Sequence, residues 1–228
     1  GKQIVHQLQS VCGVEVRNNT SISGNRTSTY TAVLDNDGEM LAAIADMSSN
    51  DYIPYPNHAD LKSAAMLVVD ANAPLHTLME AVNEANIAKV PVFFEPTSVP
   101  KCSLLGESDG FLNYVTYMSP NYDELLAMGR RNSSIKDMDI SEQLLYFDDE
   151  SIPLKVAATE ILGKMNHSEA HILTTLGKYG LMLASKGDTG GIKFSHYQAC
   201  LLQAHTHESN VTGAGDTLSA AFIFYISK

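Results

Sequence analysis

The stretch Ala65-Met66-Leu67-Val68-Val69-Asp70 is an unbroken apolar run that ends in a carboxylate. Apolar residues at helical spacing follow it, at Leu75, Leu78, Met79, Val82 and Ala85. A second apolar run then occupies residues 90–95. Continuous apolar runs are typical of strands that are covered on both faces, and a helix between two such strands favours a parallel pair. This part of the sequence therefore predicts an α/β protein.

The alternation continues toward the C-terminus. Residues 113–118 are strand-like, and Ser119-Pro120 predicts a helix start with Ser119 as the N-cap. After a polar, acidic excursion at 132–151, a helix is expected at 156–165 and strands at 171–176 and 181–185. Strands that alternate with helices predict a mostly parallel central sheet with helices on both faces.

The N-terminal part does not follow this alternation. Residues 1–11 have helical spacing, whereas 27–33 and 40–44 are β-like and joined by Asp35-Asn36-Asp37-Gly38. Asp-Gly between two extended runs predicts a hairpin, because the turn requires positive φ. We expect a separate small β lid at about 27–46. The chain starts without Met inside an amphipathic pattern and stops inside an apolar helical run, so we interpret it as truncated at both ends.

Composition limits the functional classes. The chain has 228 residues, 44% of them hydrophobic, and a net charge of −11. Such an acidic chain is not expected to bind nucleic acid, and no run approaches the roughly 20 apolar residues that span a bilayer. Its cysteines, Cys12, Cys102 and Cys200, are far apart and lack CxxC spacing, which favours reduced thiols and an intracellular, cytoplasmic protein.

The sharpest chemical motif is Asn210-Val211-Thr212-Gly213-Ala214-Gly215-Asp216, which precedes a helical run of apolar residues. Small residues let backbone N–H groups approach an anion, and a helix start adds partial positive charge. Asp216 on the first turn can accept a proton from a substrate hydroxyl while the amides hold a transferring phosphoryl group. The alternative is an ordinary Gly-rich loop in which Asp216 only starts a helix.

This motif closely resembles the C-terminal signature of the PfkB (ribokinase-like) carbohydrate kinases. The resemblance implies a ribokinase-like three-layer sandwich over residues 1–228. It also implies that Asp216 is the catalytic base and that Gly213, Ala214 and Gly215 form the anion hole. Asn210 and Thr212 would then lie at a monovalent cation site, although the family commonly has Asp where this chain has Asn210, which puts K⁺ dependence in question.

Two further motifs occur in the order and spacing of the family. Asn121-Tyr122-Asp123-Glu124 matches Asn-x-x-Glu, which implies that Asn121 and Glu124 organise Mg²⁺, through water, and phosphate. The stretch 174–180 matches the turn beside the nucleotide, which implies ATP contacts from Thr175, Gly177 and Gly180, with Asn121 nearby. Taken alone, the first motif could be simple helix-start acidity and the second a tight turn.

Within the family, the sequence resembles the pseudouridine kinase branch. The supporting stretches are Thr29 to Asp35, Ala43 to Met47, Val69 to Asn72 and Phe93 to Val99. The resemblance implies that Asp46, Asn72 and Thr31 contact the acceptor substrate. In the simpler interpretation, Asp46 closes a strand and Asn72 shapes a turn.

The resulting functional hypothesis is an ATP- and Mg²⁺-dependent kinase that converts pseudouridine to pseudouridine 5′-phosphate. A PfkB kinase for ribose, adenosine or a hexose is the first alternative. A non-catalytic kinase-like fragment is the second. Related kinases often pair through their lids, so a homodimer through residues 27–46 is an expected partner arrangement.

Overall fold

The computed structural model describes residues 2–16, 26–35, 40–53, 56, 58–107, 110–129, 138–187, 190–199 and 213–227. Residues 36–38 of the predicted hairpin turn Asp35–Gly38 and the predicted cation-site residues Asn210 and Thr212 lie outside these ranges.

In the described part of the chain, a six-stranded sheet has the order β3-β4-β5-β6-β7-β8. Its strands are β3 (Leu67–Asp70), β4 (Val92–Glu95), β5 (Tyr117–Met118), β6 (His171–Thr175), β7 (Leu181–Lys186) and β8 (Ile192–Tyr197). The pairings from β3 to β6 are parallel, whereas β7 runs antiparallel to both β6 and β8. The predicted mostly parallel sheet is confirmed.

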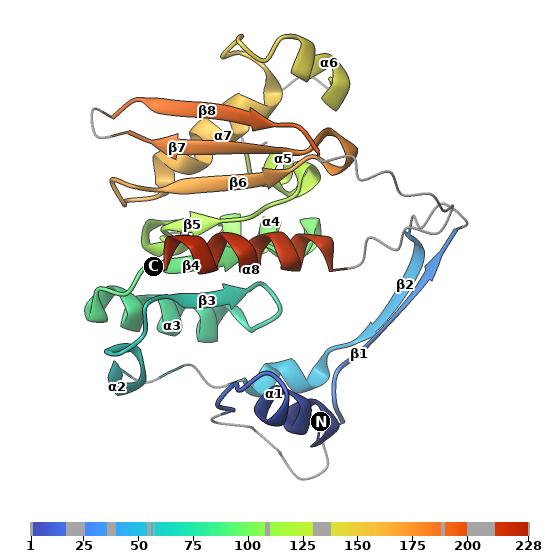
Figure 1. The fold of residues 1–228 in the computed structure, drawn as a ribbon, viewed down its shortest axis with the longest axis vertical. Helices are drawn as coiled ribbons and strands as arrows, with labels where there is room; N and C mark the ends of the chain where they lie inside the picture. The colour runs from blue at the N-terminus through green and yellow to red at the C-terminus, as the bar shows by residue number, and fades with distance from the viewer. Residues whose placement is uncertain are drawn as a thin grey trace.

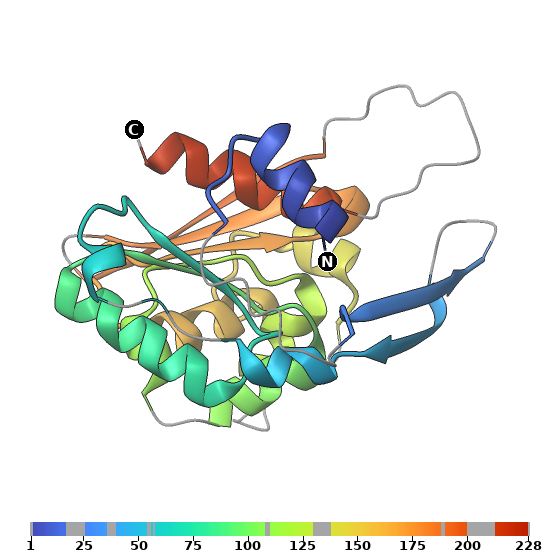
Figure 2. The ribbon, with the colours of Figure 1, turned by 90° about the horizontal axis from the view of Figure 1, so that it is seen from below.

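Helices lie on both faces of this sheet (Figures 1 and 2). One face is covered by α3 (Leu75–Ala88), α4 (Val99–Glu107), α5 (Tyr122–Gly129) and α7 (Pro153–Lys164). On the opposite face α8 (Ala214–Ile226) crosses in front of β4 and β5. The predicted three-layer arrangement is therefore confirmed. The short helices α2 (His58–Leu61) and α6 (Ile140–Leu145) and the N-terminal α1 (Lys2–Ser10) lie toward the periphery.

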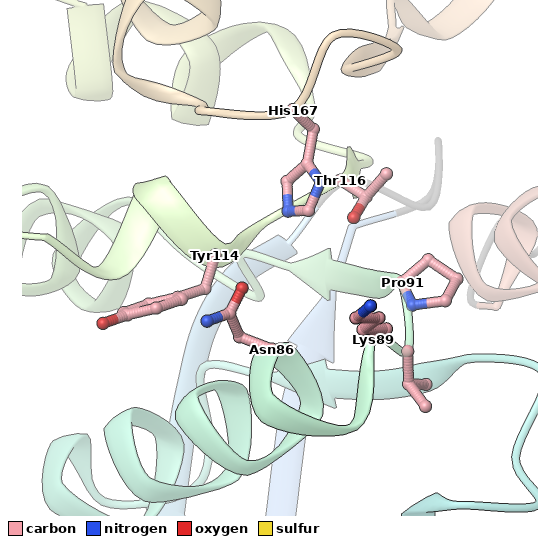
Figure 3. A pocket seen from close by; sticks show the side chains of 7 residues that line it. Asn86, Lys89, Pro91, Tyr114, Thr116 and His167 are labelled. Carbon is pink, nitrogen blue, oxygen red and sulfur yellow. The ribbon is translucent and has the colours of Figure 1, made fainter.

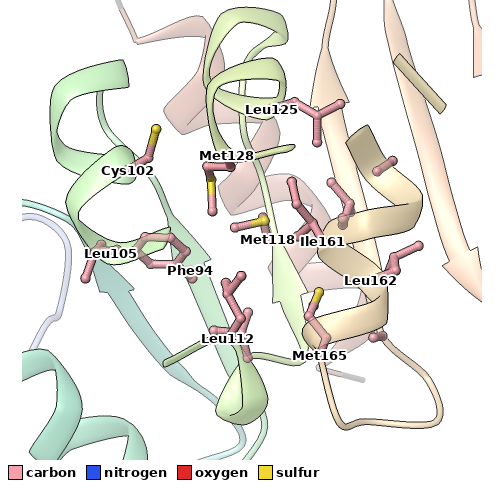
Figure 4. Close-up of a cluster of buried hydrophobic side chains, with 14 of the residues drawn as sticks. Phe94, Cys102, Leu105, Leu112, Met118, Leu125, Met128, Ile161, Leu162 and Met165 are labelled. Carbon is pink, nitrogen blue, oxygen red and sulfur yellow. The ribbon is translucent and has the colours of Figure 1, made fainter. Parts of the chain in front are cut away.

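The hydrophobic core lies between the sheet and the helices α3, α4, α5 and α7 (Figure 4). We call the side of the sheet that these helices cover the four-helix face. Strand residues Phe94 and Met118 meet helix residues Leu125, Ile161 and Leu162, and all five are almost fully buried. Phe94 also packs edge-on against Phe111, with ring centroids 4.9 Å apart. Burial of these side chains from water is the main source of stability in this layer.

The predicted hairpin is confirmed as a separate two-stranded sheet of β1 (Thr29–Leu34) and β2 (Met40–Asp46). It extends away from the main sheet on the side where the start of α8 lies (Figure 1). Its root is tied to the body through Asn50 in the 3-10 helix η1 (Ser48–Tyr52). The Ser28 hydroxyl donates to Asn50 Oδ1 at 2.8 Å, and Asn50 Nδ2 donates to the backbone carbonyl of Asn72 at 3.2 Å.

Some local predictions were wrong. Only Tyr117–Met118 of the predicted strand 113–118 pairs in the sheet, because a 3-10 helix η2 (Phe111–Tyr114) comes first. Gly110, at φ 99°, starts this turn and lets the adjacent Phe111 and Leu112 both be buried. Ser119 does not cap α5, since Asn121 does so instead.

Several elements, the short helix α2 among them, were not predicted as such. The excursion 132–151 contains α6, which begins after Asp139, whose carboxylate accepts from the Ser141 N–H at 2.8 Å. The helix α4 and the strand β8 were also missed. Finally, the described residues include no helix that is long and apolar enough to cross a membrane.

Candidate functional site

Most of the predicted site residues lie at one edge of the main sheet. The parallel strands end at this edge, and the start of α8 and the hairpin lie on the same side of the molecule (Figure 1). In open sheets of this kind, ligands bind beyond the carboxyl ends of the strands. The sheet therefore gathers motifs that are far apart in the sequence.

The start of α8 has the geometry of an anion-binding turn. Gly213 is its N-cap at φ 83°, a left-handed conformation that glycine adopts without strain. The first intrahelical acceptor is the carbonyl of Gly213, which receives the Thr217 N–H at 2.9 Å. The amides of Ala214, Gly215 and Asp216 precede that first bond, so they have no acceptor within the helix. Asp216 lies beside them in the first turn and is exposed.

Asn121 and Glu124 form a reciprocal pair at the start of α5. The Asn121 N–H donates to Glu124 Oε2 at 2.8 Å, and the Glu124 N–H donates to Asn121 Oδ1 at 2.9 Å. This is a capping box with Asn as the cap. Glu124 is 3% exposed, and its burial raises the pKa of its carboxyl, while the bond from Asn121 opposes that shift. The predicted helix-start role is therefore present, and one carboxylate oxygen of Glu124 is engaged in it.

The Thr174–Gly180 turn lies next to Asn121. Asn121 forms an isolated parallel bridge with Thr175, whose N–H donates to the carbonyl of Pro120 at 3.1 Å. Gly177 and Gly180 both have positive φ; Gly177 begins the 3-10 turn η3 (Gly177–Tyr179), and Gly180 follows it. A Cβ at Gly180 would overlap the carbonyl oxygen of Tyr197 and lie 2.6 Å from the N of Ala199, so only glycine fits here.

The predicted acceptor-side residues come from the two strands of the hairpin and from the turn after β3. Asp46 ends β2, and its Oδ1 accepts from the N–H and hydroxyl of Ser48 at 3.2 and 2.8 Å; these bonds lower the pKa of the Asp46 carboxyl. Thr31 lies on β1 opposite Ile44 and is exposed. Asn72 lies in the turn after β3, where its N–H donates to Asp70 Oδ1 at 2.8 Å. The bond from Asn50 to the carbonyl of Asn72 joins the hairpin root to this turn.

The structure adds two charged residues that the sequence did not single out. Lys101, on α4, donates from Nζ to Asn72 Oδ1. Glu95, the last residue of β4, accepts a hydrogen bond from the Ser119 hydroxyl. Burial raises the pKa of the Glu95 carboxyl, and the charges of Glu124 and Asp216 raise it further, whereas the Ser119 bond opposes the shift. An acid that directly follows the buried pair Phe93-Phe94 at a strand end was the available sequence signal for Glu95.

Two other observations concern where a metal ion or a ligand could bind. Among the residues that the structure describes, no three His, Cys, Asp or Glu side chains converge closely enough to hold a metal ion by themselves. A hollow of about 300 Å³ lies at the opposite edge, where Pro91 and Thr116 precede β4 and β5 (Figure 3). None of the predicted site residues lines that hollow, whose side chains include Asn86, Lys89 and His167.

Comparison with protein families agrees with this geometry. A family model described as pfkB family carbohydrate kinase matches residues 1–228. The chain belongs to the pfkB family of carbohydrate kinases. The resemblance found in the three sequence motifs is thereby confirmed at the level of the family.

Individual pfkB relatives are more informative about the branch. The chain is 32% identical over 164 residues to a pseudouridine kinase of Arabidopsis thaliana, which covers 68% of this chain and 42% of that protein. It is 27% identical over 213 residues to a pseudouridine kinase of Escherichia coli strain K12, with 91% of this chain and 58% of that protein covered. The chain thus spans about half the length of the curated relatives it matches.

A solved structure supports the pfkB fold. Arabidopsis thaliana ribokinase complexed with ribose and ATP aligns with a TM-score of 0.69 at 18% identity, over 99% of this chain and 65% of that chain. The likeness confirms the ribokinase-like architecture.

Proposed function

We propose that the protein containing this chain transfers the γ-phosphoryl group of ATP to the 5′-hydroxyl of pseudouridine. The observation that carries the proposal is the start of α8, where Asp216 lies beside the Ala214, Gly215 and Asp216 amides that precede the first intrahelical bond. The names of the two curated relatives support pseudouridine as the acceptor.

Each part of the α8 start has a role in this reaction. Asp216 accepts the proton of the attacking hydroxyl, and its exposure leaves it accessible to a substrate. The amides of the first turn, with the positive end of the helix dipole, stabilise charge on the transferring phosphoryl oxygens. Phosphoryl transfer depends mainly on such positioning and charge stabilisation.

Asn121 and Glu124 supply the donor types that suit Mg²⁺, an amide and a carboxylate oxygen. The capping box occupies Oε2 of Glu124, and within the described residues its other oxygen has no hydrogen bond. We assign these two residues to Mg²⁺, held through water. The ion would neutralise charge on the ATP phosphates. A K⁺ site at Asn210 and Thr212 is part of the same proposal.

ATP is assigned to the side of the Thr174–Gly180 turn, since Thr175 bridges to Asn121 and the space beside Gly177, where a Cβ would meet no other atom, is open. The acceptor is assigned to Asn72, Asp46 and Thr31, between the sheet edge and the hairpin. Closure of the hairpin as a lid would exclude water and limit ATP hydrolysis. The hairpin also exposes Leu41 and Ile44, which favours pairing with the hairpin of a second copy.

The test is ATP consumption by the complete natural protein with pseudouridine, uridine, ribose and adenosine as separate acceptors. We expect turnover with pseudouridine and a loss of about 10²- to 10⁴-fold in kcat for Asp216→Asn. Asp149→Asn is the matched control, because Asp149 is also exposed but lies before α7. Turnover of ribose or adenosine without pseudouridine would contradict the acceptor assignment, and wild-type kcat in Asp216→Asn would contradict the assigned base.

A further inference from the structure

Three elements that are distant in the sequence are joined by a chain of hydrogen bonds at the carboxyl edge. The Ser119 hydroxyl, directly after β5, donates to Glu95 Oε2 at the end of β4. The same hydroxyl oxygen lies 3.0 Å from the hydroxyl oxygen of Ser219 in α8. Ser119 is 5% exposed and Ser219 9% exposed, so the bond between them is shielded from water, whereas the Ser119–Glu95 bond is partly buried. We call this set the Glu95–Ser119–Ser219 chain.

The direction of each bond follows from the number of hydrogens available. A serine hydroxyl carries one hydrogen and can accept two bonds. Because Ser119 donates its hydrogen to the carboxylate of Glu95, its oxygen must accept from Ser219. Without that acceptor, the Ser219 hydroxyl would turn back to a carbonyl of its own helix, as serine in helices commonly does. Glu95 therefore sets the orientation of both hydroxyls.

The Glu95–Ser119–Ser219 chain matters because, among the described residues, α8 has few other contacts that fix its position. Phe222 packs against Phe93 and Tyr117, with centroid distances of 6.3 and 5.9 Å. Apolar contacts of this kind are non-directional and tolerate small shifts along the helix axis. A buried hydrogen bond has a narrow range of distance and angle, so the Ser119–Ser219 bond fixes the register of α8 on the sheet.

That register determines where Asp216 lies. Ser219 follows Asp216 by three residues, so the two side chains occupy the same side of α8, one turn apart. Ser119 immediately precedes Pro120 and Asn121, so the bond also connects α8 to the turn that carries Asn121 and Glu124. A shift of α8 would thus change the distance between Asp216 and the Asn121–Glu124 pair.

We propose that Glu95 is a positioning residue for Asp216, acting through Ser119 and Ser219. The inference rests on the proposed function, since it assigns Glu95 a task in the same reaction. Glu95 acts through the acceptor oxygen that orients the two hydroxyls, and it does not touch the reacting atoms.

Three variants distinguish a positioning role of Glu95 from a direct role in the reaction and from a role in general stability. Glu95→Gln keeps an acceptor oxygen for Ser119, whereas Glu95→Ala and Ser219→Ala each remove one bond of the chain. We expect kcat to fall about 10- to 100-fold in Glu95→Ala and Ser219→Ala, because displacement of a catalytic group by about 1 Å has effects of this size. The KM for ATP should stay unchanged in all of these variants, and the kcat of Glu95→Gln should stay near that of the wild type. The double variant Glu95→Ala/Ser219→Ala should lose no more kcat than either single variant.

Thr116→Val is the matched control. Its hydroxyl accepts from the Val92 N–H at 3.2 Å and so joins the same two strands, β4 and β5, at their opposite ends. Losing that bond should leave kcat of the folded protein unchanged.

A second measurement does not depend on turnover. Hydrogen exchange of the α8 amides should be faster in Glu95→Ala and Ser219→Ala than in wild type, and unchanged in Glu95→Gln. Unchanged α8 exchange in Glu95→Ala would overturn the positioning role. Absence of turnover in the wild-type protein, by contrast, would contradict the proposed function.

Two further results would also overturn the positioning role. If Glu95→Gln loses as much kcat as Glu95→Ala while Ser219→Ala is silent, the charge of Glu95 acts directly in the reaction. If exchange becomes faster throughout the molecule in Glu95→Ala, the residue serves general stability.

Discussion

The two faces of the sheet are built differently. On the face covered by α3, α4, α5 and α7, strand and helix side chains such as Phe94 and Leu162 are fully buried. On the α8 face, Val68 of β3 is 52% exposed and Tyr225 of α8 is 75% exposed. On the first face, burial of apolar surface holds strands and helices together. Among the described residues of the second face, α8 is held by a ring cluster around Phe222 and by the Glu95–Ser119–Ser219 chain.

This difference between the two faces means that the residues with the largest effect on stability are not the proposed site residues. Most of the proposed site residues come from turns at the carboxyl edge and from the start of α8. Their positions depend on directional hydrogen bonds, since little apolar surface is buried there. Variants on the two faces should therefore change different measured quantities.

The largest expected effect on stability is on the four-helix face. Phe94→Ala should lower the free energy of unfolding by about 3–5 kcal/mol, because it leaves a cavity in a packed core. Phe222→Ala on the α8 face should lower it by less than about 2 kcal/mol, since Phe222 is only half-buried. Urea denaturation of the two variants and the wild type measures both values. Equal losses would show that α8 is as firmly packed as the opposite layer.

An intermediate effect on stability is expected at the two glycines of the Thr174–Gly180 turn. Gly177→Ala should cost about 1–2 kcal/mol, because alanine is strained at φ 57° and its Cβ would meet no other atom. Gly180→Ala should cost more, since the same strain is joined by overlap with β8. Urea denaturation of both variants tests this ranking. A smaller loss of stability in Gly180→Ala than in Gly177→Ala would mean that the β8 backbone moves away from the added methyl group at little cost.

The smallest expected effect is a pH dependence on the α8 face. His171 stacks on Tyr117 with ring centroids 5.5 Å apart, and its burial lowers the pKa of the imidazole. The unfolded chain then binds the proton more tightly than the folded chain. Stability from this residue is present above its ordinary pKa of about 6.5 and declines as the pH falls below it.

The His171 prediction is checked by urea denaturation at pH 7.5 and pH 5.5. We expect His171→Asn to reduce the loss of stability between these pH values, by less than about 1.4 kcal/mol, the equivalent of one pKa unit. Using the difference between the two pH values cancels the lost contacts with Tyr117 and Ser185, which are common to both measurements. An unchanged difference would contradict the assigned cause.

The layers and the hairpin could be predicted because their signals are local. An apolar run such as 65–70 specifies a strand within a few residues, although this strand, β3, is half-exposed at the edge of the sheet. Asn121 with Glu124 marks a helix start within one turn. The short strand β5 was overestimated because Asn113 and Tyr114, which the predicted strand 113–118 included, belong to the 3-10 helix η2.

The contacts of Glu95 and Lys101 could not be predicted from local signals. Ser119 follows Glu95 by 24 residues, Ser219 follows Ser119 by 100, and Lys101 follows Asn72 by 29. Their proximity results from strand order and helix placement, which no spacing in the sequence encodes directly. The same holds for Asn50, which reaches Asn72 only because the hairpin root lies against the turn after β3.

That Asn50 bond has an evolutionary consequence. Asn50 binds the backbone carbonyl of residue 72, which every amino acid provides, and not its side chain. Substitutions at position 72 therefore leave the attachment of the hairpin intact. In lineages that share this geometry, residue 72, which we propose contacts the acceptor, can diversify toward new substrates while the hairpin remains anchored.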